Sequence, residues 1–396
     1  MMNTIYALLS HSWSGLVIAA LVAALGWLIV RAARWRGYPR LRGVRFIGYA
    51  VYALAALLTV GSIVAIVRIS RALSAHPPMG KLVDVGGYQL HILAEGDAKG
   101  GPTLIWIPGG HGPGLALYHL HKAMRNETRS ILFDRPGTGW SDTGPFPVST
   151  KREAEELNTL LNNAGEKGPF ILAGHSYGGL LAANYARRFP KNMAALMLLD
   201  PTPPDVFTYL PGGGGPNIPA GLARNGRMPG LLKLFGLSSD PTSTLAKRDD
   251  EIGKLIRTID ERLADVRGAM QARNRAPAGD WVTASLFTEW FDPKLVAELT
   301  VYDGELGEMP VYLITPENDS TPQSIEQQLG IKGDDAMRAF NFLKRARVRY
   351  LAISSKSELI HTPAGTGHNY PYEAPDFVVE TARRVLAKSR VAVPSS

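Results

Sequence analysis

One serine in the sequence stands in a pattern that can make it a nucleophile. Ser176 lies in the run GHSYGG, directly after an apolar stretch and before a stretch with helical periodicity. A serine on a tight turn between a strand and a helix needs small neighbours, which Gly174 and Gly178 provide. Such a turn raises the hydroxyl above the sheet and places the backbone N–H of Tyr177 where an oxyanion would form. The alternative interpretation is an ordinary strand-to-helix turn, but the spacing favours the nucleophile.

A serine hydroxyl is not deprotonated at neutral pH, so it needs a base beside it, most often a histidine. His368 is the preferred candidate because it follows the serine in the chain and stands on a loop between the last expected strand and the last expected helix. His175, inside the serine turn, is expected to support that turn. His361 lies in an expected strand and is interpreted as structural.

The histidine in turn needs a carboxylate that fixes its tautomer and stabilises the imidazolium. Asp319 is the preferred candidate, because it follows the apolar run 311–315 closely. Asp200, at the end of the apolar run 194–200, is the alternative. Another carboxylate also stays open, since these roles are set by geometry rather than by position in the chain.

A glycine-rich loop, PGGHGPG at 108–114, follows another apolar run. Glycines let backbone N–H groups approach a ligand closely, so this loop is expected to supply the second oxyanion donor. Gly110 is the preferred donor, with Gly109 or His111 as alternatives. The loop lacks the Gly-Lys-Ser/Thr ending of a phosphate-binding loop. With no cysteine in the chain, a thiolate metal site and a cysteine nucleophile are excluded. We expect neither a metal nor a cofactor.

The elements that must position these residues alternate between short apolar runs and helical stretches. This alternation predicts an α/β fold with a mostly parallel sheet and helices on both faces. The expected strands are 103–107, 130–133, 170–174, 194–200, 311–315 and 357–362, with a hairpin at 82–85 and 88–95 around Gly86-Gly87. The expected helices are about 151–164, 178–189 and 334–353. The alternation stops over 203–300, where a Gly/Pro-rich run, apolar pieces and a long helical stretch at about 249–274 predict an inserted unit.

Two uncharged apolar runs, 13–30 and 46–67, lie near the N-terminus. A bilayer core needs roughly 20 helical residues, so both are expected to be transmembrane helices. The residues before the first run include no Lys or Arg, which disfavours a cleaved signal peptide. The linker 31–45 carries six arginines and is therefore expected in the cytoplasm, where it can bind anionic headgroups. The remainder of the chain is then predicted to be extracytoplasmic.

The formal net charge of +8 is confined to this N-terminal part. Residues 1–79 contain eight arginines and no acidic residue, so acidic and basic residues balance in the rest of the chain. A neutral globular part argues against a nucleic-acid partner. A transporter is also excluded, because the two apolar runs carry no intramembrane charge.

From about residue 80 to 390 the chain resembles the α/β-hydrolase superfamily. The resemblance is carried by IPGGHGPG, FDRPGTGWSD, AGHSYGGLLAANYARRFP and GTGHNYPYEAPDFVVETA. It implies a triad of the turn serine, a late histidine and a carboxylate, and a cap inserted after the sixth strand, here 203–300. It also implies hydrolysis of an ester, amide or related bond without a cofactor. Position 176 is Ser rather than Asp, which argues against epoxide hydrolase and dehalogenase activity.

These interpretations divide the chain into a membrane anchor (1–72), a catalytic core (80–202 and 301–390) and a cap (203–300). We expect a membrane-anchored serine hydrolase, esterase- or lipase-like, that cleaves a lipophilic ester through an acyl-enzyme. The catalytic residues would be Ser176, Asp319 and His368, with Gly110 and Tyr177 at the oxyanion. An aminopeptidase on the same fold is an alternative. From another class, a binding protein without activity stays open, since fold does not determine function.

Overall fold

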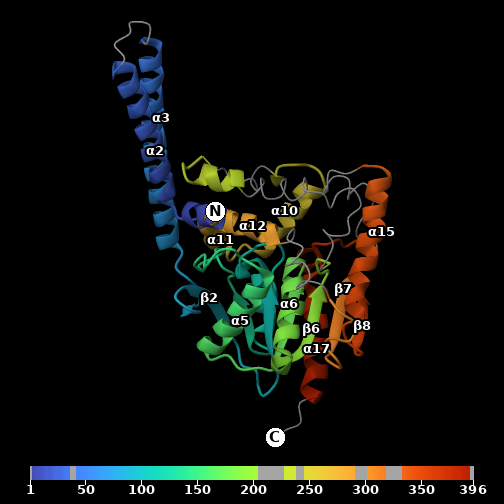
Figure 1. Ribbon diagram of the computed structural model, residues 1–396. Helices are drawn as coiled ribbons and strands as arrows, with labels where there is room; N and C mark the ends of the chain where they lie inside the picture. The colour runs from blue at the N-terminus through green and yellow to red at the C-terminus, as the bar shows by residue number, and fades with distance from the viewer. Residues whose placement is uncertain are drawn as a thin grey trace.

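The computed structural model describes residues 2–35, 42–203, 227–237, 245–289, 301–317 and 332–392. An eight-stranded sheet with the order β1-β2-β4-β3-β5-β6-β7-β8 forms its centre (Figure 1). The pairs β1·β2 and β2·β4 are antiparallel, and all other neighbouring strands are parallel. The fold class expected from the alternation of strands and helices is therefore confirmed.

The strands lie within one or two residues of their expected positions. They are β1 Lys81–Asp84, β2 Gln89–Glu95, β3 Thr103–Ile107, β4 Ser130–Phe133, β5 Phe170–His175, β6 Met193–Leu199, β7 Val311–Thr315 and β8 Ser357–His361. Strands β3, β4, β5 and β7 are buried along their whole length. Continuous apolar strands of this kind form where helices cover both faces of a parallel sheet.

Helices pack on the two faces of the sheet and close the core. On one face lie α4 (Tyr118–Met124) and α17 (Pro375–Ala392). On the other lie α5 (Thr150–Ala164) and α6 (Tyr177–Arg188). Helix α5 begins where the side chain of Ser149 accepts a hydrogen bond from the backbone N–H of Arg152, which caps one of the unpaired N–H groups of the first turn.

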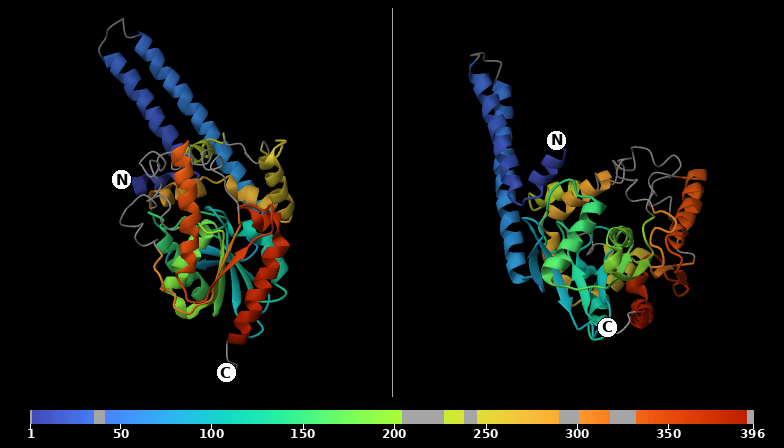
Figure 2. Two further views of the ribbon diagram at one scale, coloured as in Figure 1. Left: turned by 90° about the vertical axis from the view of Figure 1, so that its right-hand side faces the viewer. Right: turned by 60° about the horizontal axis from the view of Figure 1, so that its bottom comes forward.

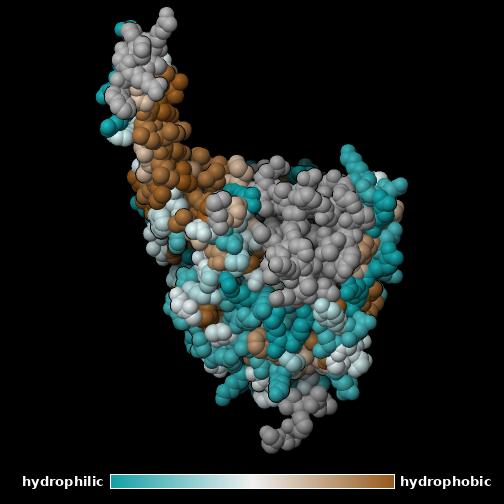
Figure 3. All heavy atoms as spheres, in the orientation of Figure 1, coloured by the Kyte–Doolittle hydropathy of each residue, from teal (hydrophilic) through white to brown (hydrophobic). Residues whose placement is uncertain are grey.

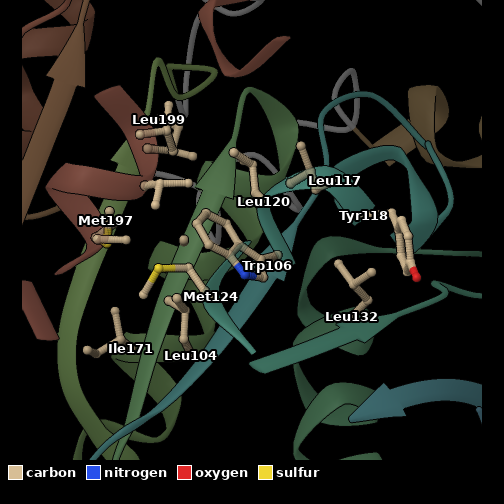
Figure 4. Close-up of a cluster of buried hydrophobic side chains, with 14 of the residues drawn as sticks. Leu104, Trp106, Leu117, Tyr118, Leu120, Met124, Leu132, Ile171, Met197 and Leu199 are labelled. Atoms are coloured by element: carbon tan, nitrogen blue, oxygen red, sulfur yellow. The ribbon is translucent and has the colours of Figure 1, made fainter. Parts of the chain in front are cut away.

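The core beneath α4 is built around Trp106 of β3. Its ring is fully buried, with the side chains of Leu120 and Met124 beside it (Figure 4). The indole N–H donates to the hydroxyl of Ser130, 3.1 Å away, so burial leaves no polar group of this side chain unpaired. The sheet therefore provides a rigid base for the loops at its carboxyl edge.

Two long apolar helices, α2 (Ser14–Trp35) and α3 (Arg42–Ala75), form an antiparallel hairpin that projects from the body (Figures 1 and 2). The helices are packed closely: a Cβ on Gly26 would lie 3.2 Å from the carbonyl oxygen of Gly48. Both are long and apolar enough to cross a membrane, and only 22% and 17% of their apolar windows are buried. The two expected N-terminal apolar helices are therefore present, and they are not core helices of the body.

A short helix that the sequence analysis did not anticipate, α1 (Met2–Leu9), precedes the hairpin. It packs against α12 (Ala278–Glu289), and its Tyr6 is 1% exposed, with the ring 5.8 Å from that of Trp281. Short helices are marginal alone, so this contact with the body stabilises α1.

Between β6 and β7 the structure contains α10 (Glu251–Arg262), α11 (Arg267–Asn274) and α12. The helical stretch expected at 249–274 is thus two helices with a break between them. They lie over loops at the carboxyl edge of the sheet: Arg262, for example, donates to the carbonyl of Tyr372. Residues 204–226, 238–244 and 290–300 of the expected cap lie outside the described residues. The division into core and cap therefore stays a prediction.

Candidate active site

Ser176 lies at the sharp turn between β5 and α6, with φ +53° and ψ −120°. A non-glycine residue rarely adopts this conformation, which costs on the order of 1–3 kcal/mol and is tolerated where the surroundings enforce it. Here the backbone N–H of Ser176 donates to the carbonyl of Leu199 at 3.0 Å. A Cβ on Gly174 would overlap the carbonyl of Gly178, so the two glycines permit the turn that the sequence analysis inferred.

His368 lies between β8 and α16 (Tyr370–Glu373), and its Nδ1 is hydrogen-bonded to a carboxylate oxygen of Asp200. Asp200 directly follows β6 and is fully buried, whereas the side chain of His368 is 42% exposed. The structure thus joins the predicted base to the alternative carboxylate of the sequence analysis.

Asp200 is held ionised in the protein interior by its neighbours. Its other carboxylate oxygen accepts a hydrogen bond from the hydroxyl of Thr315 at 2.7 Å and lies 3.2 Å from Nε of Arg347. Burial opposes ionisation, but the hydrogen bond from His368 and the charge of Arg347 outweigh it and lower the pKa of Asp200. A buried anion beside an exposed imidazole is suited to stabilise the imidazolium.

Asp319, the preferred carboxylate of the sequence analysis, lies outside the described residues. His368 has one N–H at Nδ1 to give, and Asp200 occupies that position. The geometry therefore favours Asp200 over Asp319 as the partner of His368. Both candidates were placed after strands that run side by side, so sequence position alone did not separate them.

His175 connects the histidine loop to the serine turn. Its Nε2 lies 2.8 Å from the backbone carbonyl oxygen of His368, and the two rings are 4.8 Å apart. Burial, with a smaller effect of the charge on His368, lowers the pKa of His175 to about 4. A neutral His175 can therefore donate its Nε2–H to that carbonyl at neutral pH. This contact holds the loop of His368 against the serine turn, to which His175 belongs.

Two segments that are expected to supply oxyanion donors contact Ser176 or follow it directly. Tyr177 is the first residue of α6, where backbone N–H groups point out of the helix end. The glycine-rich loop packs against the serine: a Cβ on Gly109 would lie 2.9 Å from the Cβ of Ser176. The next residue, Gly110, has φ +53°, a conformation that glycine adopts without strain.

A buried arginine lies behind this loop. Arg135, from the segment FDRPGTGWSD, is 0% exposed and donates through one guanidinium nitrogen to the carbonyls of Gly110 and Gly112. Its guanidinium also lies 4.9 Å from the ring centroid of Tyr177. Arg135 therefore contacts both segments that are expected to supply oxyanion donors.

The acidic residue whose ionisation the charge of Arg135 favours is Glu153 on α5, which is 2% exposed. Glu153 accepts a 2.6 Å hydrogen bond from the hydroxyl of Tyr177 and lies 3.4 Å from Nε2 of His111. Burial opposes ionisation of Glu153, but His111 and the charge of Arg135 outweigh it and lower its pKa. Burial also lowers the pKa of His111, so the charged pair of this cluster is Arg135 and Glu153.

The sequence analysis missed this cluster. Arg135 belongs to the segment FDRPGTGWSD, which the sequence analysis used only as part of the family resemblance. Glu153 lies near the start of a helix rich in charged residues, a composition that is typical of a helix on the surface. Within the described ranges, no group of three or more His, Asp or Glu could hold a metal ion. The chemistry that these residues can support is nucleophilic attack by a serine, with an imidazole as base and backbone N–H groups as oxyanion donors.

Comparison with known proteins gives the same fold. A family model described as the alpha/beta hydrolase family matches residues 104–381. A probable hydrolytic enzyme from Pseudomonas aeruginosa is 19% identical, with a TM-score of 0.54 over 79% of this chain and 95% of that one. A thermophilic esterase from Thermogutta terrifontis is 19% identical, with a TM-score of 0.52 over 78% of this chain and 98% of that one.

Among curated proteins, an uncharacterized vacuolar membrane protein of Saccharomyces cerevisiae is 33% identical over 133 residues. The match covers 28% of this chain and 20% of that protein. The chain thus spans about a fifth of the length of this relative.

Proposed function

The chain belongs to the alpha/beta hydrolase family, and from this premise we propose that it is a membrane-anchored serine hydrolase that cleaves lipophilic esters. One observation carries the proposal. His368, hydrogen-bonded to the buried Asp200, is positioned by His175 next to the strained turn of Ser176. In this proposal Ser176 is the nucleophile, His368 the base and Asp200, rather than Asp319, the acid.

The reaction proceeds in two halves. His368 takes the proton of the Ser176 hydroxyl as the oxygen attacks the ester carbonyl, and backbone N–H groups of Gly110 and Tyr177 stabilise the oxyanion. His368 then gives that proton to the leaving alcohol, and the acyl group stays on Ser176. Water, deprotonated by His368, releases the acid and regenerates the serine. Asp200 remains ionised throughout and stabilises the imidazolium.

An ester is favoured over a peptide with a free amino terminus by the acidic residues of the expected cap. An aminopeptidase needs a carboxylate there to bind the substrate amine. Asp280 of α12, whose side chain is 17% exposed, lies 2.6 Å from Lys233, and Asp250 caps α10 and binds Arg248. Both are engaged within the protein.

Membrane anchoring is supported by the two exposed apolar helices of the hairpin, together with the six arginines of the connecting segment. Short arginine-rich loops stay in the cytoplasm, so the proposed orientation puts the hydrolase body on the opposite side. The name of the yeast relative, a vacuolar membrane protein, is consistent with a membrane location.

The hydrolase is tested with a fluorophosphonate probe on the purified full chain. The probe is expected to label Ser176, and Ser176→Ala should abolish the labelling. The same variant should lose hydrolysis of chromogenic esters, which are tested over a series of increasing acyl length. Ser355→Ala, which removes an exposed serine of another loop, serves as the matched control and keeps both signals. Undiminished labelling of Ser176→Ala would refute the proposed nucleophile.

The orientation is tested separately, with reporters fused after Ser396 in a Gram-negative host. Alkaline phosphatase is expected to be active there and green fluorescent protein dark. A fluorescent fusion with inactive phosphatase would place the body in the cytoplasm.

A further inference from the structure

The N-terminal helix and a distant segment of the chain form one surface beside the hairpin. Helix α1 lies against residues 227–237: Arg227 donates to the hydroxyl of Tyr6 at 2.9 Å, and Leu231 packs with Tyr6 and Trp281. We call α1 and residues 227–237 together the platform. Helix α1 belongs to the expected anchor and residues 227–237 belong to the expected cap, and the structure brings the two together.

The platform is seated directly on the hairpin. A Cβ on Gly61 of α3 would lie 2.8 Å from the carbonyl oxygen of Phe235, and one on Gly15 of α2 would lie 2.6 Å from that of Leu234. Glycines on both helices are therefore needed for this approach. Figure 1 shows α1 beside the lower end of the hairpin, where it meets the body.

The contact lies at a defined depth along the hairpin. Gly61 precedes Arg68, the first charged residue after the apolar run 46–67, by seven residues. At 1.5 Å per residue this is about 10 Å along the helix axis. Arg68 and Arg71 are exposed and suited to the headgroup level. The platform therefore contacts α3 at the depth of roughly 5–10 Å to which interfacial helices bury their apolar faces.

The outward side of the platform is apolar. On α1, Met2, Ile5 and Leu8 recur at a spacing of three residues and are 45%, 39% and 53% exposed. On the other segment, Met228 and Leu232 are 51% and 38% exposed. Figure 3 shows the hydrophobic surface of the hairpin continuing onto the adjoining part of the body.

The two cations of residues 227–237 do not contribute to this outward side. Arg227 binds Tyr6, and Lys233 lies 2.6 Å from Asp280 of α12, with its side chain 16% exposed. Pairing of both charges within the protein leaves apolar side chains as the groups that face out. A water-facing helix would normally show the reverse arrangement.

We propose that the platform docks into the outer leaflet of the bilayer as a third membrane contact, besides the two hairpin helices. This inference rests on the proposed membrane anchoring and is independent of the catalytic residues. Lipid is the proposed partner of this surface for two reasons. The platform continues the apolar surface of the hairpin, and it contacts α3 at Gly61, which lies inside the apolar run 46–67. The body is then held with the platform side against the membrane, where esters dissolved in the bilayer are at hand.

The chain contains no cysteine, so single cysteines can be introduced at will. Leu8→Cys and Leu232→Cys, on the two parts of the platform, are labelled with an environment-sensitive fluorophore in the full chain, reconstituted in phosphatidylcholine–phosphatidylglycerol vesicles. Leu57→Cys, 71% exposed in the middle of α3, is the control for the hairpin. Met337→Cys, at a position that is 46% exposed on α15 (Asp334–Val348), is the control for a label in contact with water. Quenching by doxyl lipids is compared with quenching by aqueous iodide.

Positions 8 and 232 are expected to show blue-shifted emission, quenching by shallow doxyl lipids and loss of iodide quenching, relative to position 337. If position 57 is quenched by lipid while positions 8 and 232 behave like 337, the platform proposal is wrong and the anchor stands. If position 57 is also open to iodide, both the anchor and the platform are refuted. None of these outcomes depends on hydrolysis, which the fluorophosphonate experiment tests on its own.

Discussion

Two buried carboxylates lie on either side of the serine turn, and each has an arginine and a histidine as neighbours. Asp200 contacts His368 and lies beside Arg347. Glu153 lies beside His111, and the charge of Arg135 favours its ionisation. In both cases burial opposes ionisation, and the neighbouring groups outweigh it and lower the pKa.

The two clusters differ in their access to solvent and substrate. The side chain of His368 is 42% exposed, and that of His111 is 2% exposed. A histidine that exchanges protons during a reaction must reach the reacting groups, whereas a sealed and neutral histidine keeps its proton. Under the proposed function, similar residues serve two purposes. The group of Asp200, His368 and Arg347, called here the responsive side, adjusts to a change of charge. The group of Glu153, His111 and Arg135, called here the sealed side, keeps its charges constant and holds the loop of Gly110.

The largest effect on activity is expected from a substitution of Asp200, the carboxylate of the responsive side. Asp200→Asn removes the anion that orients His368, so kcat should fall on the order of 10⁴-fold, as in the best-studied triad. The measurement is steady-state ester hydrolysis by the full chain, with circular dichroism as the check on folding. Asp319→Asn is the matched control and should lower kcat far less. The reverse ranking would return the acid to Asp319.

A substitution of Arg135, on the sealed side, should lower both the free energy of unfolding and kcat. Arg135→Met leaves Glu153 buried without the nearby positive charge that favours its ionisation. It also leaves buried acceptors without a donor, which costs about 1–3 kcal/mol of unfolding free energy. The acceptors are the carbonyls of Gly110 and Gly112, so kcat should also fall. Both are measured on the full chain in detergent, by denaturant unfolding and by ester hydrolysis.

The control for this variant is the double substitution Arg135→Met with Glu153→Gln, which removes both charges. It should regain much of the lost stability, because no uncompensated charge stays buried. If the double variant is as unstable as the sum of the two single variants, Arg135 and Glu153 are not coupled and the role assigned to the sealed side is wrong.

Some residues of the candidate site could be predicted from the sequence and others could not, for a physical reason. Ser176, Gly110 and Tyr177 stand in local patterns, because a strand-to-helix turn and a glycine-rich loop require particular neighbours in the chain. The acid was harder to identify, since the carboxyl ends of β6 and β7 lie side by side and both are followed by an aspartate. Only the packing of the histidine loop favours Asp200.

The charged cluster behind the loop could not be anticipated at all. A charged residue in a helix or loop reads as a surface residue, and nothing in their spacing pairs Arg135 with Glu153. Helix α1 was missed for a similar reason, because its order depends on Tyr6 packing against Trp281 rather than on any local signal. Strands were predicted well, since burial on both faces of a sheet leaves continuous apolar runs.

A third carboxylate sharpens the comparison. Glu156 lies one turn after Glu153 on α5 and is also buried, but its partner is the neutral Tyr88. Burial raises the pKa of Glu156 to about 7. The folded state therefore binds this proton more tightly than the unfolded state, where the pKa is about 4.3, and stability falls as pH rises through the window between the two values.

Glu156→Gln should remove this pH dependence. Between pH 5 and pH 8 the free energy of unfolding of the variant should gain about 2–3 kcal/mol relative to that of the parent chain. Denaturant unfolding at the two pH values measures the difference. Glu155→Gln, an exposed neighbour on the same helix, is the control and should show no such change. A difference between parent and variant that is the same at both pH values would contradict the assignment.

The smallest effect is expected at Arg347, the arginine on the responsive side. Its Nε lies 3.2 Å from Asp200, but Asp200 also has hydrogen bonds from His368 and Thr315, so Arg347→Gln leaves the carboxylate with partners. Loss of the cation removes one of the causes that lower the pKa of Asp200, so this carboxylate becomes easier to protonate. The acidic limb of the kcat/KM profile should therefore move to higher pH, by about half a unit to one unit, while the plateau stays close to that of the parent.

Arg349→Gln, whose arginine donates to the carbonyl of Val301, is the matched control and should leave the limb in place. If Arg347→Gln instead lost stability as Arg135→Met is expected to, the two arginines would play the same role, and the distinction between a responsive and a sealed side would fail.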